Sequence, residues 1–171
     1  MKKLIAVAFG VFLSLTNFCN AQSTLKFGHI NSNELFAIMP ESKVADSLLN
    51  KFIASLQAQS KSMNAELQQK YSDYKSKESS MADPIKEAKE KELSDLQDRI
   101  QSFEESAQTS LQKKREELQM PLIKKAQDAI DAVAKEKGYS YIFDTVQGGV
   151  ILFAQDSDNI LPLVKTKLGI K

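Results

Sequence analysis

Apolar residues recur at helical spacing along the stretch from Glu41 to Gly138, which contains no other glycine and only two prolines. In its first part the apolar positions are mostly four, three and four residues apart. This eleven-residue repeat favours a nearly straight helix over a left-handed supercoil. At two positions of this stripe, where the repeat would place an apolar residue, the chain has the polar residues Ser60 and Glu78. The apolar members are Ala45, Leu49, Phe52, Leu56, Met63, Leu67, Tyr71, Tyr74 and Met81.

A second stripe follows Pro84 and is closer to a heptad repeat. Asp83 before Pro84 is typical of an N-cap and first helical position, and the preceding helix should end near Met81. The pattern therefore predicts two helices of similar length, folded back at Ser79–Pro84. At 1.5 Å per residue each would reach about 60 Å. The second stripe comprises Ile85, Ala88, Leu93, Leu96, Ile100, Phe103, Ala107, Leu111 and Leu118.

Pro121 should kink the second helix, since it removes one backbone hydrogen bond and crowds the preceding turn. Beyond it the apolar face becomes richer, which indicates packing on something more solid than a partner helix. Gly138 is expected to cap the helix end. This face consists of Leu122, Ala126, Ala129, Ile130 and Val133.

Short strands and helices are predicted on both sides of the hairpin. Leu25–Ile30 alternates as a strand, and Asn31 with Glu34 resembles a capping box that opens a short helix to Met39. After the hairpin, Tyr139–Phe143 and Gly149–Phe153 have the β-branched and aromatic content of strands. Asp144–Gly148 should hold their turn, Asp156–Asn159 a turn and cap, and Ile160–Leu168 a closing helix.

We therefore expect an α+β fold in a single domain, residues 22–171. Residues 22–41 and 122–171 would form a small β-sheet body, and residues 42–121 a helical-hairpin arm. So small a body rarely buries enough apolar surface alone, which favours oligomerisation. The residues expected to build the core between subunits are Phe27, Ile30, Tyr141, Phe143, Ile151 and Phe153.

The first 21 residues have the pattern of a cleaved secretory signal. Lys2 and Lys3 precede the apolar run Leu4–Leu15, and Cys19-Asn20-Ala21 provides small residues at the cleavage site. A lipoprotein signal with a lipidated Cys19 is the alternative, although Phe18 is bulky for that role. Cleavage after Ala21 would leave a soluble protein outside the inner membrane with no cysteine.

Charge and residue types exclude most chemistry. The chain has 23 basic and 22 acidic residues, so no strong field favours nucleic acid or an anionic membrane. His29, the only histidine, is expected to be structural. We find no phosphate loop or nucleophile motif, and predict no catalytic residues, metal or cofactor. The charged run Lys86–Glu92 is interpreted as solvated helix surface.

The residues near the hairpin tip have two interpretations. They can form the packing between the two helices, or an apolar surface that faces a binding partner. Met and Tyr suit both roles, because Met adapts its shape and Tyr has an apolar body with a polar edge. The candidates for the binding surface are Met63, Leu67, Tyr71, Tyr74, Met81, Ile85, Leu93 and Leu96.

The order of these elements resembles the Skp/OmpH-like periplasmic chaperones over essentially the whole mature chain. The resemblance implies a homotrimer with a shared β-barrel body and three helical hairpins around a cavity. Such proteins hold unfolded outer-membrane proteins without ATP and prevent their aggregation. The matching stretches are Phe27–Ser32, Met39–Glu41, Met120–Pro121, Val133–Tyr139, Tyr141–Asp144 and Val150–Phe153.

Two departures from the family pattern bear on function. Asn159-Ile160-Leu161, followed by Pro162, stands where members often carry Asp-Ile-Thr. The best-known members also have basic arms, whereas residues 41–83 are balanced in charge and residues 84–118 carry slightly more acidic than basic groups. Electrostatic capture of clients, or contact with membrane or lipopolysaccharide, is therefore weakly supported. A structural spacer or adaptor of the cell envelope is the alternative function.

Overall fold

The computed structural model describes residues 25–146 and 151–170. The predicted signal sequence, residues 1–21, therefore lies outside the described residues, as do positions 147–150 of the second predicted strand and its turn. The described elements, in chain order, are β1 (Phe27–Ile30), α2 (Ser32–Ile38), α3 (Pro40–Lys77), η2 (Glu78–Ser80), α4 (Asp83–Lys137), β2 (Tyr141–Asp144), η3 (Asp156–Asp158) and α5 (Leu161–Lys167).

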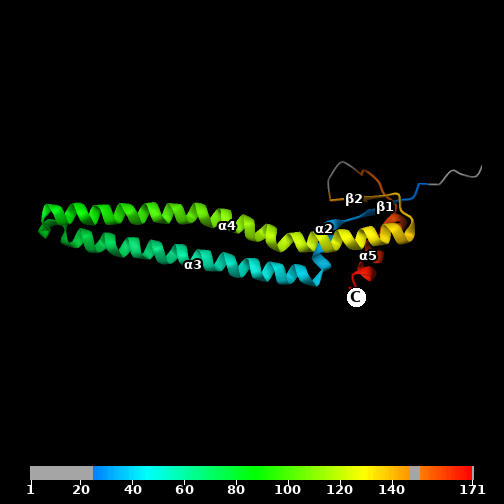
Figure 1. Cartoon of the computed structure of the whole chain (residues 1–171), viewed down its shortest axis with the longest axis horizontal. Coiled ribbons are helices and arrows are strands. Elements are labelled where there is room, and N and C mark those ends of the chain that lie inside the picture. The colour runs from blue at the N-terminus through cyan, green and yellow to red at the C-terminus, as the bar shows by residue number, and fades with distance from the viewer. Residues whose placement is uncertain (1–24, 147–150, 171) are drawn as a thin grey trace, which may run out of the picture.

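The helices α3 and α4 form a long antiparallel hairpin that projects from a small body (Figure 1). The predicted hairpin is confirmed, but the prediction that its two helices have similar lengths is wrong. The helix α3 has 38 residues and α4 has 55, because α4 continues through Pro121 into the body. A proline removes only one bond of the helical ladder, and beyond Pro121 the face with Ala126, Ala129 and Val133 packs into the core of the body, which stabilises the continued helix.

The turn of the hairpin differs slightly from the prediction. The helix α3 ends at Lys77 and a 3₁₀ turn follows, so the helix stops before the expected Met81. Ala82, not Asp83, is the N-cap of α4, without a side-chain hydrogen bond. Asp83 is instead the first helical residue, where its carboxylate still meets the positive end of the helix dipole.

The body contains a two-stranded parallel sheet. Phe27 pairs with Tyr141 and Ile30 with Asp144, so the whole arm is the crossover between the two strands. The predicted strand at residues 149–153 is wrong for Ile151–Phe153, which lie in no strand. The edge of β1 away from β2 is already occupied, because Ile160 N donates to His29 O at 2.9 Å.

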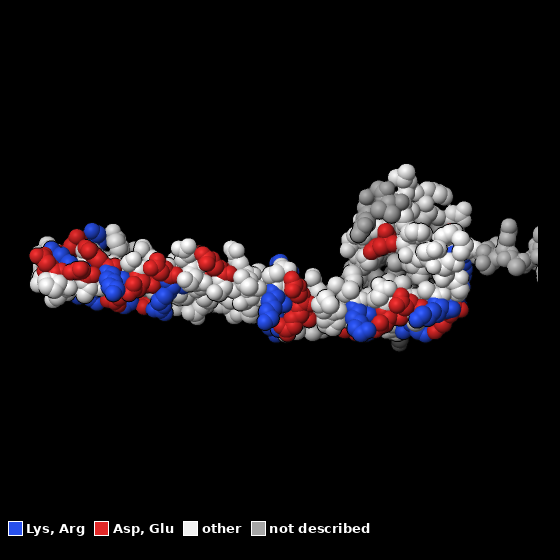
Figure 2. Space-filling model, turned by 45° about the horizontal axis from the view of Figure 1, so that its top comes forward, with Lys and Arg blue, Asp and Glu red and all other residues white. Residues whose placement is uncertain are grey.

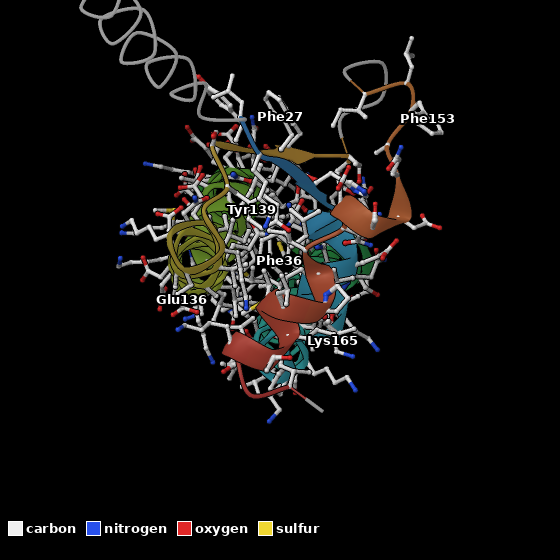
Figure 3. All side chains as sticks on the ribbon, turned by 90° about the vertical axis from the view of Figure 1, so that its right-hand side faces the viewer. Phe27, Phe36, Glu136, Tyr139, Phe153 and Lys165 are labelled. Carbon is white, nitrogen blue, oxygen red and sulfur yellow. The ribbon has the colours of Figure 1, made fainter. Side chains whose placement is uncertain are left out.

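The core of the body lies between the sheet and the helices α2, α4 and α5. Figure 3 looks along the arm and shows Tyr139 and Phe36 inside this layer, with Glu136 and Lys165 pointing outward. Tyr139 packs over Gly28, where a Cβ would come within 2.9 Å of the ring. The buried members of the core are Ile30, Leu35, Met39, Ala126, Ala129, Val133, Ile160 and Val164.

Several local signals are confirmed by the backbone. Asn31 caps α2 and accepts a hydrogen bond from Glu34 N. Gly138 ends α4 in the left-handed region, with φ of 68°, which a glycine adopts without strain. Asn159 accepts from Leu161 N at the start of α5. These caps place the body elements at the base of the arm.

Candidate functional site

An exposed aromatic face covers the side of the sheet that faces away from the helices. Phe27, Tyr141 and Phe143 stack on one another, with ring centroids 5.8 to 6.4 Å apart. Their exposed fractions are 46%, 58% and 41%. Figure 3 shows Phe27 standing on this side of the sheet. Stacked aromatic rings left in water are characteristic of an interaction surface.

The strand register explains why these rings meet. Successive side chains of a strand alternate between faces, so Gly28 and Ile30 point to the core while Phe27 points away. The parallel register then places Tyr141 beside Phe27 and Phe143 beside His29. Of the predicted body residues, Ile30 is therefore misassigned to a surface between subunits: it is 2% exposed in the core of its own chain.

Ile151 and Phe153 lie next to the aromatic face. With Phe27 and Phe143 they line a hollow of about 460 Å³. Phe153 is 82% exposed and points outward in Figure 3, and the neighbouring Leu152 is 94% exposed. The structure thus gathers five of the six predicted body residues at one side of the sheet.

The predicted arm residues divide according to burial. Met63, Tyr74 and Leu96 are buried between α3 and α4, and therefore pack the hairpin in this conformation. Three more, Leu67, Met81 and Leu93, are half-buried. Tyr71 and Ile85 are exposed at 47% and 53%. The sequence pattern could not separate buried from exposed arm residues. In a thin hairpin, one apolar stripe supplies both the contact between α3 and α4, here called the seam, and the partly exposed residues at its edges.

Polar contacts join the two helices near the hairpin tip. Lys70 forms an ion pair with Glu92, which also accepts from Lys89 Nζ at 2.7 Å. The Tyr74 hydroxyl donates to Glu90 Oε1 at 2.6 Å. Of the run Lys86–Glu92, predicted as solvated surface, Glu90 is exposed and Glu92 is half-buried, and both accept a hydrogen bond from α3. The sequence carries a signal for the Lys70–Glu92 pair. The two residues are nearly equally far along the chain from the turn, and so they face each other in the hairpin.

These contacts raise the pKa of Lys70, and they shift the pKa values of Glu92 and Tyr74 strongly. The hydrogen bonds from Lys70 and then Lys89 lower the pKa of Glu92 from its ordinary 4.5 to about 2. The hydrogen bond to Glu90, followed by burial, raises the pKa of Tyr74 from 10.0 to about 12. Both groups hold their charge state across the neutral range, so this end of the hairpin is held in the same way across physiological pH.

Charges elsewhere are mixed in sign. Figure 2 shows basic and acidic groups side by side near the tip and again near the base, with a largely uncharged surface between them. At the base, Glu41 of α3 forms an ion pair with Lys125 of α4. The hydrogen bond from Lys125 lowers the pKa of Glu41. The visible face has no large patch of one sign that would attract a polyanion.

His29 has a structural position. Its Nε2 lies 3.0 Å from Gln155 O, which ties β1 to the segment before η3. Within residues 25–146 and 151–170 no group of three potential metal ligands occurs. In the same ranges, no helix combines the length and apolar character needed to cross a membrane.

Comparison with known proteins gives a consistent result. The family model described as outer membrane protein (OmpH-like) matches residues 26–168. A solved structure from Caulobacter crescentus CB15, provisionally described as an outer membrane chaperone (OmpH-like), superposes with a TM-score of 0.74. The two chains share 14% identity, and the match covers 86% of each. A search of curated proteins found no match.

Proposed function

The chain belongs to the OmpH-like family of envelope chaperones, a family without catalytic activity, and from this membership we propose that it is an ATP-independent holdase of the periplasm. Its clients are unfolded outer-membrane β-barrel proteins. It binds them in a cavity between helical arms and keeps them from aggregating until they are released.

The arm is the observation that carries this proposal. At 1.5 Å per residue, the 38 residues of α3 extend about 57 Å, far beyond what the body needs for its own core. Each arm helix packs only on its partner, so its local stability is low and the arm can adapt to clients of different shape. Weak, spread contacts of this kind suit many clients.

The cavity requires several arms, and the exposed aromatic face supplies the means of assembly. Phe27, Tyr141 and Phe143, joined by Ile151 and Phe153, would pack against the same residues of two further copies in a homotrimer. Ile151–Phe153 pair with no strand among residues 25–146 and 151–170, which supports pairing with a neighbouring subunit.

Among the predicted arm residues, those that are exposed to solvent form the proposed client surface. Tyr71 and Ile85 are exposed, and Leu67, Met81 and Leu93 present partial surfaces beside them. Met63, Tyr74 and Leu96 would meet a client only if the helices separated. The exposed members lie on both helices, so a client can contact either side of the seam.

An aggregation assay tests the proposal. An unfolded outer-membrane β-barrel is diluted from urea with and without the cleaved protein, in the absence of nucleotide, and light scattering is followed. We expect suppression near one trimer per client. Removal of residues 60–105 should abolish suppression and leave the trimer intact.

Two results would contradict the holdase. The first is aggregation that continues at several-fold excess of the protein. The second is stoichiometric binding of a single folded partner through a defined patch, which is the behaviour of the structural spacer. A folded β-barrel serves as the control and should not be bound.

A further inference from the structure

The middle of the arm differs from both of its ends. Residues 52–60 of α3 contain no charged side chain, and neither do residues 106–112 of α4. The two segments lie at the same level of the hairpin, because Leu56 and Ala107 line one common hollow. On the tip side are Lys70 and Glu92, and on the body side Glu41 and Lys125, each an ion pair between the helices.

The seam is also incompletely packed at this level. On the body side of Tyr74, the buried residues between the helices are Met63, Leu96 and Ile100, and the next buried residue of α4 toward the body is Ala126. In the described arm, no hydrogen bond or ion pair joins α3 to the part of α4 between Ile100 and the Lys125–Ala126 level. A hollow of about 330 Å³ remains, and its apolar walls are Ile53, Leu56, Phe103, Ala107 and Leu111.

The rim of this hollow offers neutral hydrogen-bonding groups. Gln57 and Gln108 stand on opposite helices, and among the described residues neither side-chain amide has a hydrogen-bond partner. By contrast, Gln69, Gln101 and Gln112 each donate to a carboxylate one turn further along their helix. Glu104 is the one charged residue that lines the hollow.

We propose that this mid-arm groove binds an uncharged, extended segment of an unfolded chain, with apolar side chains in the hollow and its backbone on the rim amides. The inference rests on the proposed holdase function and specifies its site and substrate class. An extended segment has free N–H and C=O groups for Gln57 and Gln108, whereas a helix satisfies its own. A charge placed in the groove would lose hydration, and the exposed Glu104 offers a positive charge only a weak, solvent-screened partner.

Gln57 and Gln68 provide a matched pair of positions. They are one eleven-residue repeat apart and therefore lie on nearly the same face of α3. Both are exposed, so a charged replacement is compatible with the fold at either place. Only Gln57 lines the groove. Placing Lys and Glu at each position distinguishes an effect of charge in the groove from a general electrostatic effect of adding charge to the arm.

The probe is a dye-labelled peptide of about a dozen residues with capped ends, alternating Val or Leu with Ser or Asn. Binding to the full cleaved chain is measured by fluorescence anisotropy. We expect Gln57→Lys and Gln57→Glu each to weaken binding about tenfold. Gln68→Lys and Gln68→Glu should change it less than about twofold. Two further peptides, one with a central Lys or Glu and one that forms a helix, should bind the unmodified chain about as weakly as the uncharged peptide binds the Gln57 variants.

The inference is overturned if the peptide does not bind, if the Gln68 variants weaken it equally, or if only one sign of charge matters. It is also overturned if the Gln57 variants lower the molecular mass, because the occupant would then be a second copy. Aggregation suppression by the unmodified chain is measured in parallel. If suppression persists while the Gln57 variants bind the peptide normally, the groove is wrong and the holdase stands; if suppression is absent, the holdase itself fails.

Discussion

Gly28 is the residue at which the sheet and the end of α4 meet most closely. An added Cβ would lie 2.9 Å from Tyr139 Cε1 and 3.0 Å from Ile160 Cγ2. The ring has little room to retreat, because Tyr139 is half-buried and packs against the core of the body. We expect Gly28→Ala to lower the free energy of unfolding of the body by about 1–3 kcal/mol, as overpacking does. Urea denaturation measures the change.

A second substitution separates this clash from a general effect on the strand. Tyr139→Leu removes the ring, so Gly28→Ala on that background should cost clearly less than on the unmodified chain. Equal costs on both backgrounds would show that the ring is not what confines Gly28.

Glu92 makes the tip of the hairpin sensitive to strong acid. Its folded pKa, about 2, lies below the ordinary 4.5 because Lys70 and Lys89 donate to it. Its contribution to stability is therefore complete above about pH 4.5 and is lost as the pH falls toward 2. Carboxyl chemical shifts should titrate accordingly. Lys70→Met should move the midpoint upward, and a midpoint near 4.5 in the unmodified chain would refute the pairing.

At the scale of the element, the arm should be unevenly stable along its length. Leu96 is 3% exposed in the seam, whereas Leu111 only lines the mid-arm hollow and is half-buried. Leu96→Ala should therefore cost about 2–4 kcal/mol of local stability, and Leu111→Ala about 1 kcal/mol or less. Amide hydrogen exchange of α3 and α4, read residue by residue, measures both. Similar losses at the two positions would mean that the middle of the arm is packed as tightly as its distal part.

The helices were predictable from the sequence because their signals are local. Pro84, Gly138 and the stripe positions between them specify helix, turn and cap without reference to the rest of the chain. The contacts of Glu90 and Glu92 with α3 do not follow from their own segment, because they depend on the register of the hairpin, which the sequence shows only through distance from the turn. Ile30 was misplaced for a similar reason, since the alternation of β1 shows two faces but not which one the helices cover. The strand expected at residues 149–153 is wrong at Ile151–Phe153, because β-branched and aromatic content does not by itself produce pairing: Asn159 and Ile160 occupy one edge of β1, and among the described residues β2 pairs only with β1.

At the scale of the whole molecule, the arm is an insertion between two paired strands. Because β1 and β2 are parallel, a crossover must connect them, and here that crossover is the entire hairpin. The strands thus fix the base of the arm, and the sheet's outer face remains free for assembly. Under the proposed function, the body would join subunits while the arm would contact clients.

This division predicts that assembly can be disrupted without unfolding the chain. Tyr141 and Phe143 are 58% and 41% exposed, so Tyr141→Ser with Phe143→Ser removes little from the core of a single subunit. In the trimer the same rings would be buried at its centre, where lost aromatic contacts cost most. We expect a monomer at micromolar concentration by light scattering, with unchanged helical circular dichroism. Tyr71→Ser, at a position 47% exposed on the arm, is the control and should leave the trimer mass unchanged. An unmodified chain that is already monomeric, or a double variant that keeps the trimer mass, would exclude the aromatic face as the site of assembly.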